Sequence, residues 1–84
     1  MAGEKLIGKI SHYFGNIGVG IIELSDVLNV GDKIHIKGSS TDFEQTIDSM
    51  QIEHQNIDVV KAGDGVGVKM IEKVREGDEV YKVL

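Results

Sequence analysis

Histidine, serine and acidic side chains are the groups in this 84-residue chain that could carry out chemistry. The three histidines, His12, His35 and His54, lie on separate segments, and no cysteine is present to complete a zinc site. No serine stands in the G-x-S-x-G turn that exposes the nucleophile of many hydrolases. We therefore predict no catalytic residue, no metal site and no cofactor, so that the chain is not an enzyme. Each histidine is expected on a polar face of the fold.

Two glycine-rich stretches could suggest phosphate binding, since the backbone N–H groups of such loops can surround a phosphate. Neither 15–20 nor 63–67 matches G-x-G-x-x-G, and neither precedes a predicted helix. We interpret both stretches as turns and close strand packing. The G-x-x-x-x-G-K-[ST] phosphate loop is also missing from the sequence, so the chain is not expected to bind GTP by itself.

The turn after the first predicted strand carries more apolar surface than a turn needs. Tyr13, Phe14, Asn16 and Ile17 place two aromatic rings and a large aliphatic side chain beside Gly15. Aromatic residues on loops are typical of protein hot spots and of base-stacking surfaces. These four residues are the candidate partner-binding site, for a protein or for the ribosome or RNA. The alternative is that Phe14 and Ile17 close the end of a barrel, which requires no partner.

The elements that carry these residues follow from alternating hydrophobicity between eleven glycines, in a chain without proline. In the first strand, strict alternation places Leu6, Ile10 and Phe14 on one face. Ser25 and Asp26 are residues of the type that caps a helix, which indicates a single helical turn over 25–28. The predicted strands cover 5–14, 17–24, 33–37, 41–55, 63–70 and 79–84.

The spacing of apolar residues changes within 41–55, between Ile47 and Met50, and a flat strand would exchange its faces there. We predict a bulge or bend near Asp48 and Ser49, which lets one strand serve two sides of a barrel. The predicted fold class is all-β: a small closed or nearly closed antiparallel β-barrel of six to seven strands. Residues 1–84 form this single domain, with 1–4 as a flexible N-terminus.

The charge balance limits the partners. Fourteen acidic residues against nine basic ones give a formal net charge of −5. Proteins that bind nucleic acid through its phosphates usually carry a basic surplus instead. No apolar stretch approaches the roughly 20 residues that cross a bilayer, and the first residues lack a signal-peptide pattern. We expect no membrane contact and a cytoplasmic location, and the oligomeric state stays open.

Three phrases of the sequence carry a family resemblance: LNVGDKIHIKG at 28–38, SMQIEH running on to KAGDGVGV within 49–68, and VREGDEV at 74–80. In order and spacing they resemble domain 2, the β-barrel, of translational GTPases such as elongation factor Tu, over nearly the whole chain. A similar small barrel also ends the collagenase-type bacterial peptidases. The phrases consist of turns and core positions, which indicate a fold more than a ligand.

The resemblance implies a stand-alone, non-catalytic binding module that contacts the ribosome, RNA or a translation-related protein, without the GTP-binding domain of that family. Where elongation factor Tu carries a basic residue in the second strand, this sequence has Ile17, so binding of the tRNA acceptor end is not carried over. The alternative is an accessory or regulatory β-barrel subunit of an enzyme, such as a collagenase-type peptidase, with no nucleic-acid contact. The acidic charge balance favours this alternative.

Overall fold

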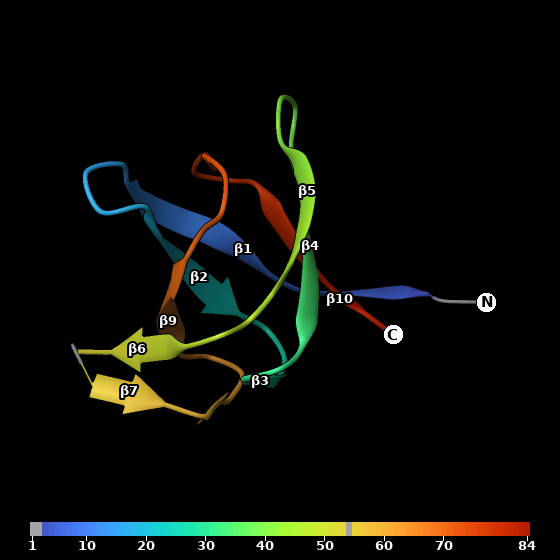
Figure 1. Ribbon diagram of the computed structural model, residues 1–84. Helices are drawn as coiled ribbons and strands as arrows, with labels where there is room; N and C mark the ends of the chain where they lie inside the picture. The colour runs from blue at the N-terminus through green and yellow to red at the C-terminus, as the bar shows by residue number, and fades with distance from the viewer. Residues whose placement is uncertain (1–2, 54) are drawn as a thin grey trace.

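The computed structural model describes residues 3–53 and 55–84, which form ten strands joined by turns and loops, with no helix among them (Figure 1). Every strand pairing is antiparallel, which confirms the all-β antiparallel class. The strands are β1 Glu4–Phe14, β2 Val19–Leu24, β3 Leu28–Asn29, β4 Lys33–Lys37, β5 Asp42–Thr46, β6 Met50–Ile52, β7 Gln55–Ile57, β8 Val59–Val60, β9 Gly65–Lys69 and β10 Glu79–Val83.

Eight of these strands form one curved sheet in the order β5-β4-β10-β1-β2-β9-β6-β7, and β3 pairs with β8 separately. Among the described residues the ladder has two ends, β5 and β7, so the sheet does not close into a barrel. The prediction of a closed or nearly closed barrel of six to seven strands is corrected accordingly. The predicted number of strands was too low, because β3, β7 and β8 are only two or three residues long and such short strands show no alternating pattern in the sequence.

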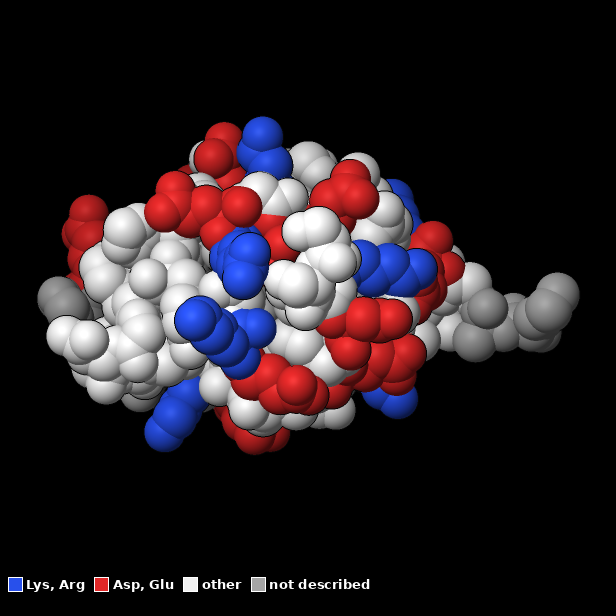
Figure 2. All heavy atoms as spheres, turned by 90° about the horizontal axis from the view of Figure 1, so that it is seen from above, with Lys and Arg blue, Asp and Glu red and all other residues white. Residues whose placement is uncertain are grey.

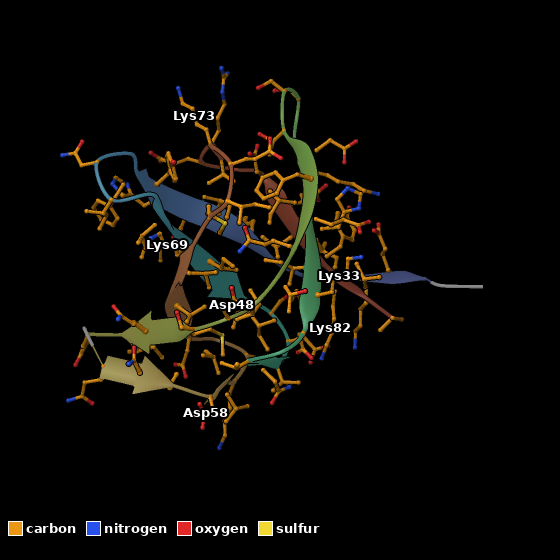
Figure 3. All side chains as sticks on the ribbon, viewed as in Figure 1. Lys33, Asp48, Asp58, Lys69, Lys73 and Lys82 are labelled. Carbon is orange, nitrogen blue, oxygen red and sulfur yellow. The ribbon has the colours of Figure 1, made fainter. Side chains whose placement is uncertain are left out.

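The bend predicted near Asp48 and Ser49 is confirmed. β5 ends at Thr46 and pairs with β4, whereas β6 begins at Met50 and pairs with β9 and β7. The chain therefore passes from one end of the sheet to strands near the other, and Asp48 lies on the connecting segment (Figure 3). Buried Ile47 fixes this passage, because its N–H donates to Asp32 O and its carbonyl accepts from Gly31 N, both at 2.8 Å.

The strict alternation predicted for the first strand is wrong, because β1 contains two irregularities. Its register shifts between Leu6 and Gly8 against β10, and between Ile10 and His12 against β2. As a result Ile10 is buried, while Leu6 and Phe14 are 47% and 45% exposed. A β-bulge adds one residue to a strand and thereby exchanges the faces that follow it.

Three turns are built in the same way: each contains a Gly-Asp pair whose glycine has a positive φ. Gly31, Gly63 and Gly77 have φ angles of 95°, 93° and 91°, a region that favours glycine. At two of the turns the aspartate also caps the turn: an Asp32 oxygen accepts from Asn29 N, and an Asp78 oxygen from Arg75 N, both at 2.9 Å. The sequence phrases that carried the family resemblance contain these turns.

The core consists of the inward-facing residues of the alternating strands. Ile34 and Ile36 of β4 are fully buried, and Val66 and Val68 of β9 are 1% exposed. The glycines of β9 lie on the opposite face, as predicted from the alternation. The helical turn predicted over 25–28 is not formed, because this segment bends into β3, whose Leu28 is buried opposite Val60 of β8.

The N-terminal segment predicted to be flexible, 1–4, lies partly outside the described residues, which begin at Gly3. Glu4 belongs to β1, opposite Val83, and the Gly3 carbonyl accepts a 2.8 Å hydrogen bond from Leu84 N. Within the described part of the chain, no helix has the length and apolar character needed to span a bilayer.

Candidate partner-binding site

The β1–β2 turn, 15–18, directs two large apolar side chains outward. The N–H groups of Ile17 and Gly18 both donate to Phe14 O, at 3.2 and 2.8 Å, and Gly18 has a φ of 68°. Phe14 and Ile17 are 45% and 63% exposed, and Asn16 is exposed as well. Tyr13, in contrast, is half-buried and packs against the core. Of the four predicted residues, Phe14, Asn16 and Ile17 are thus exposed at the surface, and Tyr13 is half-buried against the core.

A groove of about 500 Å³, which we call the β1–β2 groove after the turn at which it begins, runs from there across the outer face of β2, β9 and β6. Its floor is the backbone of Gly65 and Gly67 in β9, and Gln51 and Glu53 supply its polar edge. Its apolar walls are Phe14, Ile17, Val19, Ile21 and Ile52. The groove is therefore mostly apolar, with a small polar edge, as is usual for a binding surface.

Internal packing does not require glycine on the floor of the groove. A Cβ on Gly65 would meet nothing closer than 3.7 Å, and one on Gly67 nothing closer than 3.5 Å, which are ordinary contacts. A Cβ on Gly8 of β1, in contrast, would lie 2.4 Å from the carbonyl oxygen of Glu23. Glycine within a strand is less stable than alanine by about 0.5–1 kcal/mol, and such positions often mark the close approach of a ligand or another backbone.

Few charged side chains cover the end of the molecule that carries the β1–β2 turn. Viewed from above, much of the surface on the side of the β1–β2 turn is uncharged, while acidic and basic side chains alternate over the rest of the visible face (Figure 2). The His12 ring packs against the Phe14 ring at an interplanar angle of 59°, with ring centroids 4.3 Å apart, and His12 Nδ1 lies 3.7 Å from Glu76. These contacts hold the Phe14 ring at the edge of the groove.

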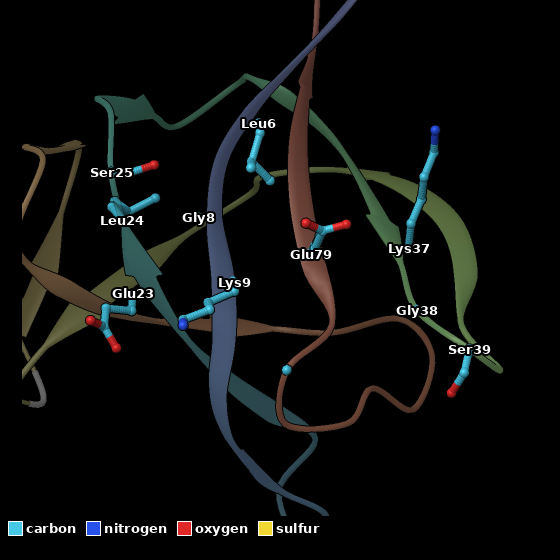
Figure 4. A pocket seen from close by; sticks show the side chains of 11 residues that line it. Leu6, Gly8, Lys9, Glu23, Leu24, Ser25, Lys37, Gly38, Ser39 and Glu79 are labelled. Atoms are coloured by element: carbon cyan, nitrogen blue, oxygen red, sulfur yellow. The ribbon is translucent and has the colours of Figure 1, made fainter.

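A second hollow, of about 620 Å³, lies between the outer faces of β2, β1, β10 and β4 (Figure 4). Charges of both signs line it: Lys9 stands opposite Glu23 in the register of β1 and β2, and Glu79 stands opposite Lys9 on β10. No histidine lines the hollow among the described residues, so its serines, Ser25 and Ser39, have no histidine base there.

Of the two described histidines, His35 of β4 has the larger number of carboxylates within reach. Its Nδ1 lies 2.5 Å from a Glu4 oxygen, and its Nε2 contacts the Asp42 carboxylate. The hydrogen bonds to Asp42 and to Glu4 raise the pKa of His35 above its usual range. Sequence spacing could not reveal this cluster, because Glu4 is 31 residues away and β1 reaches β4 across β10. His54, predicted on a polar face, lies outside the described residues.

Comparison with known proteins points to peptidases. The chain is 42% identical over 76 residues to an uncharacterized protease of Methanocaldococcus jannaschii, covering 89% of this chain and 19% of that protein. It is 32% identical over 81 residues to a collagenase of Porphyromonas gingivalis, covering 94% of this chain and 22% of that protein. The chain thus spans about a fifth of the length of the curated relatives it matches. No family model matches it.

The fold matches that of a solved C-terminal domain of a putative peptidase. The crystal structure of the C-terminal domain of a putative U32 peptidase from Geobacillus thermoleovorans matches with a TM-score of 0.86 at 17% identity, covering 93% of this chain and 91% of that one. A selenomethionine variant of the same domain matches with the same score.

These relatives overturn the resemblance to domain 2 of the translational GTPases. The interpretation as a translation-factor-like module that contacts the ribosome or RNA is wrong, and the findings favour the alternative, an accessory domain of a peptidase. The error has a physical origin: the phrases behind it contain the Gly-Asp turns and the strands that follow them. Residues of that kind specify chain reversals and a core, and unrelated functions can share them.

Proposed function

We propose that this chain is a non-catalytic accessory domain of a U32-type peptidase and that its β1–β2 groove docks on the peptidase body. The observation that carries the proposal is similarity over about nine-tenths of the chain to one part, about a fifth, of larger proteases. The match in fold to a domain that ends a putative U32 peptidase supports the same function. The cytoplasmic location expected from the sequence stays a prediction.

A non-catalytic role fits the placement of the reactive side chains. Outside the His35 cluster, the described histidine is His12, which packs at a tilt against Phe14 and has one carboxylate 3.7 Å away. The serines of the larger hollow have no histidine beside them there. A serine hydrolase site needs a serine beside a base, and the described lining residues of the groove and of the larger hollow bring no serine and histidine together.

The groove fits a protein surface as its occupant. Exposed Phe14 and Ile17 supply the large apolar anchors on which protein interfaces depend. The bare backbone of Gly65 and Gly67 leaves room for a side chain of the partner to lie directly on the sheet. Because Glu53 stands at the polar edge, the matching surface should present an apolar side chain flanked by a basic residue or by N–H donors.

The proposal is tested with two proteins: the 84-residue chain, and the M. jannaschii relative from which the matching 76 residues have been removed, which we call the trimmed protease. The chain alone should not hydrolyse gelatin or casein, and it should form a one-to-one complex with the trimmed protease in analytical ultracentrifugation. Hydrolysis by the chain alone that a point substitution abolishes would contradict the non-catalytic role. Separate sedimentation of the two proteins would contradict the docking.

A further inference from the structure

A cluster centred on His35 lies on the face of the sheet away from the core, and it shares no residue with the groove. Its three principal residues come from three strands: Glu4 from β1, His35 from β4 and Glu44 from β5. One ligand atom from each, a ring nitrogen and two carboxylate oxygens, lies within 4.8 Å of the others. His35 and Glu44 stand directly opposite each other in the register of β4 and β5.

The imidazole of His35 is oriented by a fourth residue. Its Nε2 contacts the Asp42 carboxylate, and its Nδ1 consequently faces Glu4 Oε2 at 2.5 Å and Glu44 Oε2 at 3.8 Å. The His35 side chain is only 14% exposed, so its ring has little freedom to turn. Metal-binding histidines characteristically donate their other ring N–H to a carboxylate, which fixes the tautomer and the direction of the ligating nitrogen. Asp42 stands in that position.

Two lysines orient the carboxylates. Lys37 Nζ lies 2.9 Å from Glu4 Oε1, and Lys33 Nζ lies 3.0 Å from Glu44 Oε1. Each lysine therefore holds one oxygen of its carboxylate and leaves the other, Oε2, near His35 Nδ1. Lys33 projects from β4 on this side of the sheet (Figure 3). The lysines also compete with a cation for the carboxylates, so the affinity should be lower than that of a closed structural site.

We propose that His35 Nδ1, Glu4 Oε2 and Glu44 Oε2 form a three-ligand site for a zinc-like divalent transition metal, with Asp42 as the positioning residue. Zinc takes one imidazole nitrogen and two carboxylate oxygens at about 2.0–2.2 Å, and a water completes the tetrahedron. Two ligands at such distances lie about 3.3 Å apart, so Glu44 Oε2 moves closer to Nδ1 and Glu4 Oε2 moves away. The ion replaces the proton on Nδ1, which passes to solvent. Calcium and magnesium are disfavoured, because they prefer six or more oxygen ligands.

The probe is zinc chloride, titrated calorimetrically into the untagged 84-residue chain in a buffer that does not bind metals. We expect one zinc per chain. His35→Gln and Glu44→Gln should each weaken binding at least tenfold, and Asp42→Asn should weaken it by about 10- to 100-fold although it removes no ligand. His12→Gln is the matched control, because His12 has a single carboxylate within reach, and this substitution should leave the affinity unchanged.

Cobalt(II) provides a second readout. If the cluster binds metal, the wild-type chain with cobalt(II) should show the intense visible absorption band of tetrahedral coordination, and His35→Gln should not. If the cluster is only a set of ion pairs, neither protein should show the band. Circular dichroism establishes that each variant is folded, and surface-exposed Glu44 supplies a test that does not disturb the core. The proposal is overturned if the folded wild-type chain takes up no zinc. It is equally overturned if His35→Gln and Glu44→Gln bind zinc as the wild type does.

Discussion

The side chain of Gln45 forms hydrogen bonds to two backbone groups around Met70, donating from Nε2 to Lys69 O at 2.9 Å and accepting at Oε1 from Ile71 N at 3.0 Å. Gln45 lies on β5, and in the strand order β5 and β9 are not neighbours. A buried side chain therefore connects the end of β9 to a strand with which it shares no ladder. This contact holds the sheet in its curved form where backbone pairing stops.

Replacing Gln45 by leucine should destabilise the fold by about 1–3 kcal/mol, because two partly buried hydrogen bonds, each contributing about 0.5–1.5 kcal/mol, are lost. Gln45→Glu keeps the acceptor for Ile71 N and loses the donor to Lys69 O, and it places a negative charge in a buried position. The measurement is the midpoint of urea unfolding. An unchanged midpoint for Gln45→Leu would show that the contact does not hold the two segments together.

The glycines of the sheet should separate into two groups on substitution by alanine. Gly8→Ala should destabilise by about 1–3 kcal/mol, because the new Cβ meets the Glu23 carbonyl at 2.4 Å. Gly65→Ala should leave stability unchanged or raise it by up to about 1 kcal/mol, since its Cβ finds only ordinary contacts. Thermal unfolding of both variants checks this difference. Equal destabilisation would mean that the groove floor is glycine for internal reasons.

Asp32 should make part of the stability dependent on pH. Burial acts to raise its pKa, but the hydrogen bond from Asn29 N and the Lys82 ammonium, 3.2 Å away, outweigh burial and hold the pKa below its usual value. A carboxylate with a lowered folded pKa contributes stability that is fully present above its unfolded pKa of about 3.9 and is lost as pH falls through the folded pKa.

The measurement for Asp32 is the free energy of unfolding between pH 2 and pH 6, for the wild type and for Asp32→Asn. The asparagine keeps an acceptor for Asn29 N and loses the attraction to Lys82, so its stability should vary less with pH in the acid range. Curves that run parallel over this range would contradict the assignment.

Much of the fold could be predicted from the sequence, where local pattern and tertiary structure agree. The strand Lys33–Lys37 and the bend near Asp48 follow from the spacing of apolar residues alone. The faces of β1 could not be predicted, because its register shifts, between Leu6 and Gly8 against β10 and between Ile10 and His12 against β2, arise from strand pairing and not from the local sequence pattern. The short pairing of β3 with β8 depends on contacts between distant segments, which periodicity does not record.

The candidate site was predicted only in part. Phe14 and Ile17 could be identified because large apolar residues are unusual in a turn, and the structure exposes both. The opposite wall, Ile52 of β6, joins them only after the chain has bent at 47–49, so no local pattern indicates the groove. The His35 cluster was missed for the same reason, since Glu4 and His35 meet across β10.

The central claim is that this chain docks on a peptidase body through the β1–β2 groove. The most direct test is the dissociation constant of the complex with the trimmed protease for two matched variants, Ile17→Ser and Ile71→Ser. Both isoleucines are similarly exposed, at 63% and 66%, but only Ile17 lines the groove. We predict that Ile17→Ser weakens the complex at least about tenfold, equivalent to about 1.4 kcal/mol, and that Ile71→Ser leaves it unchanged. Equal affinities for the two variants would contradict the claim.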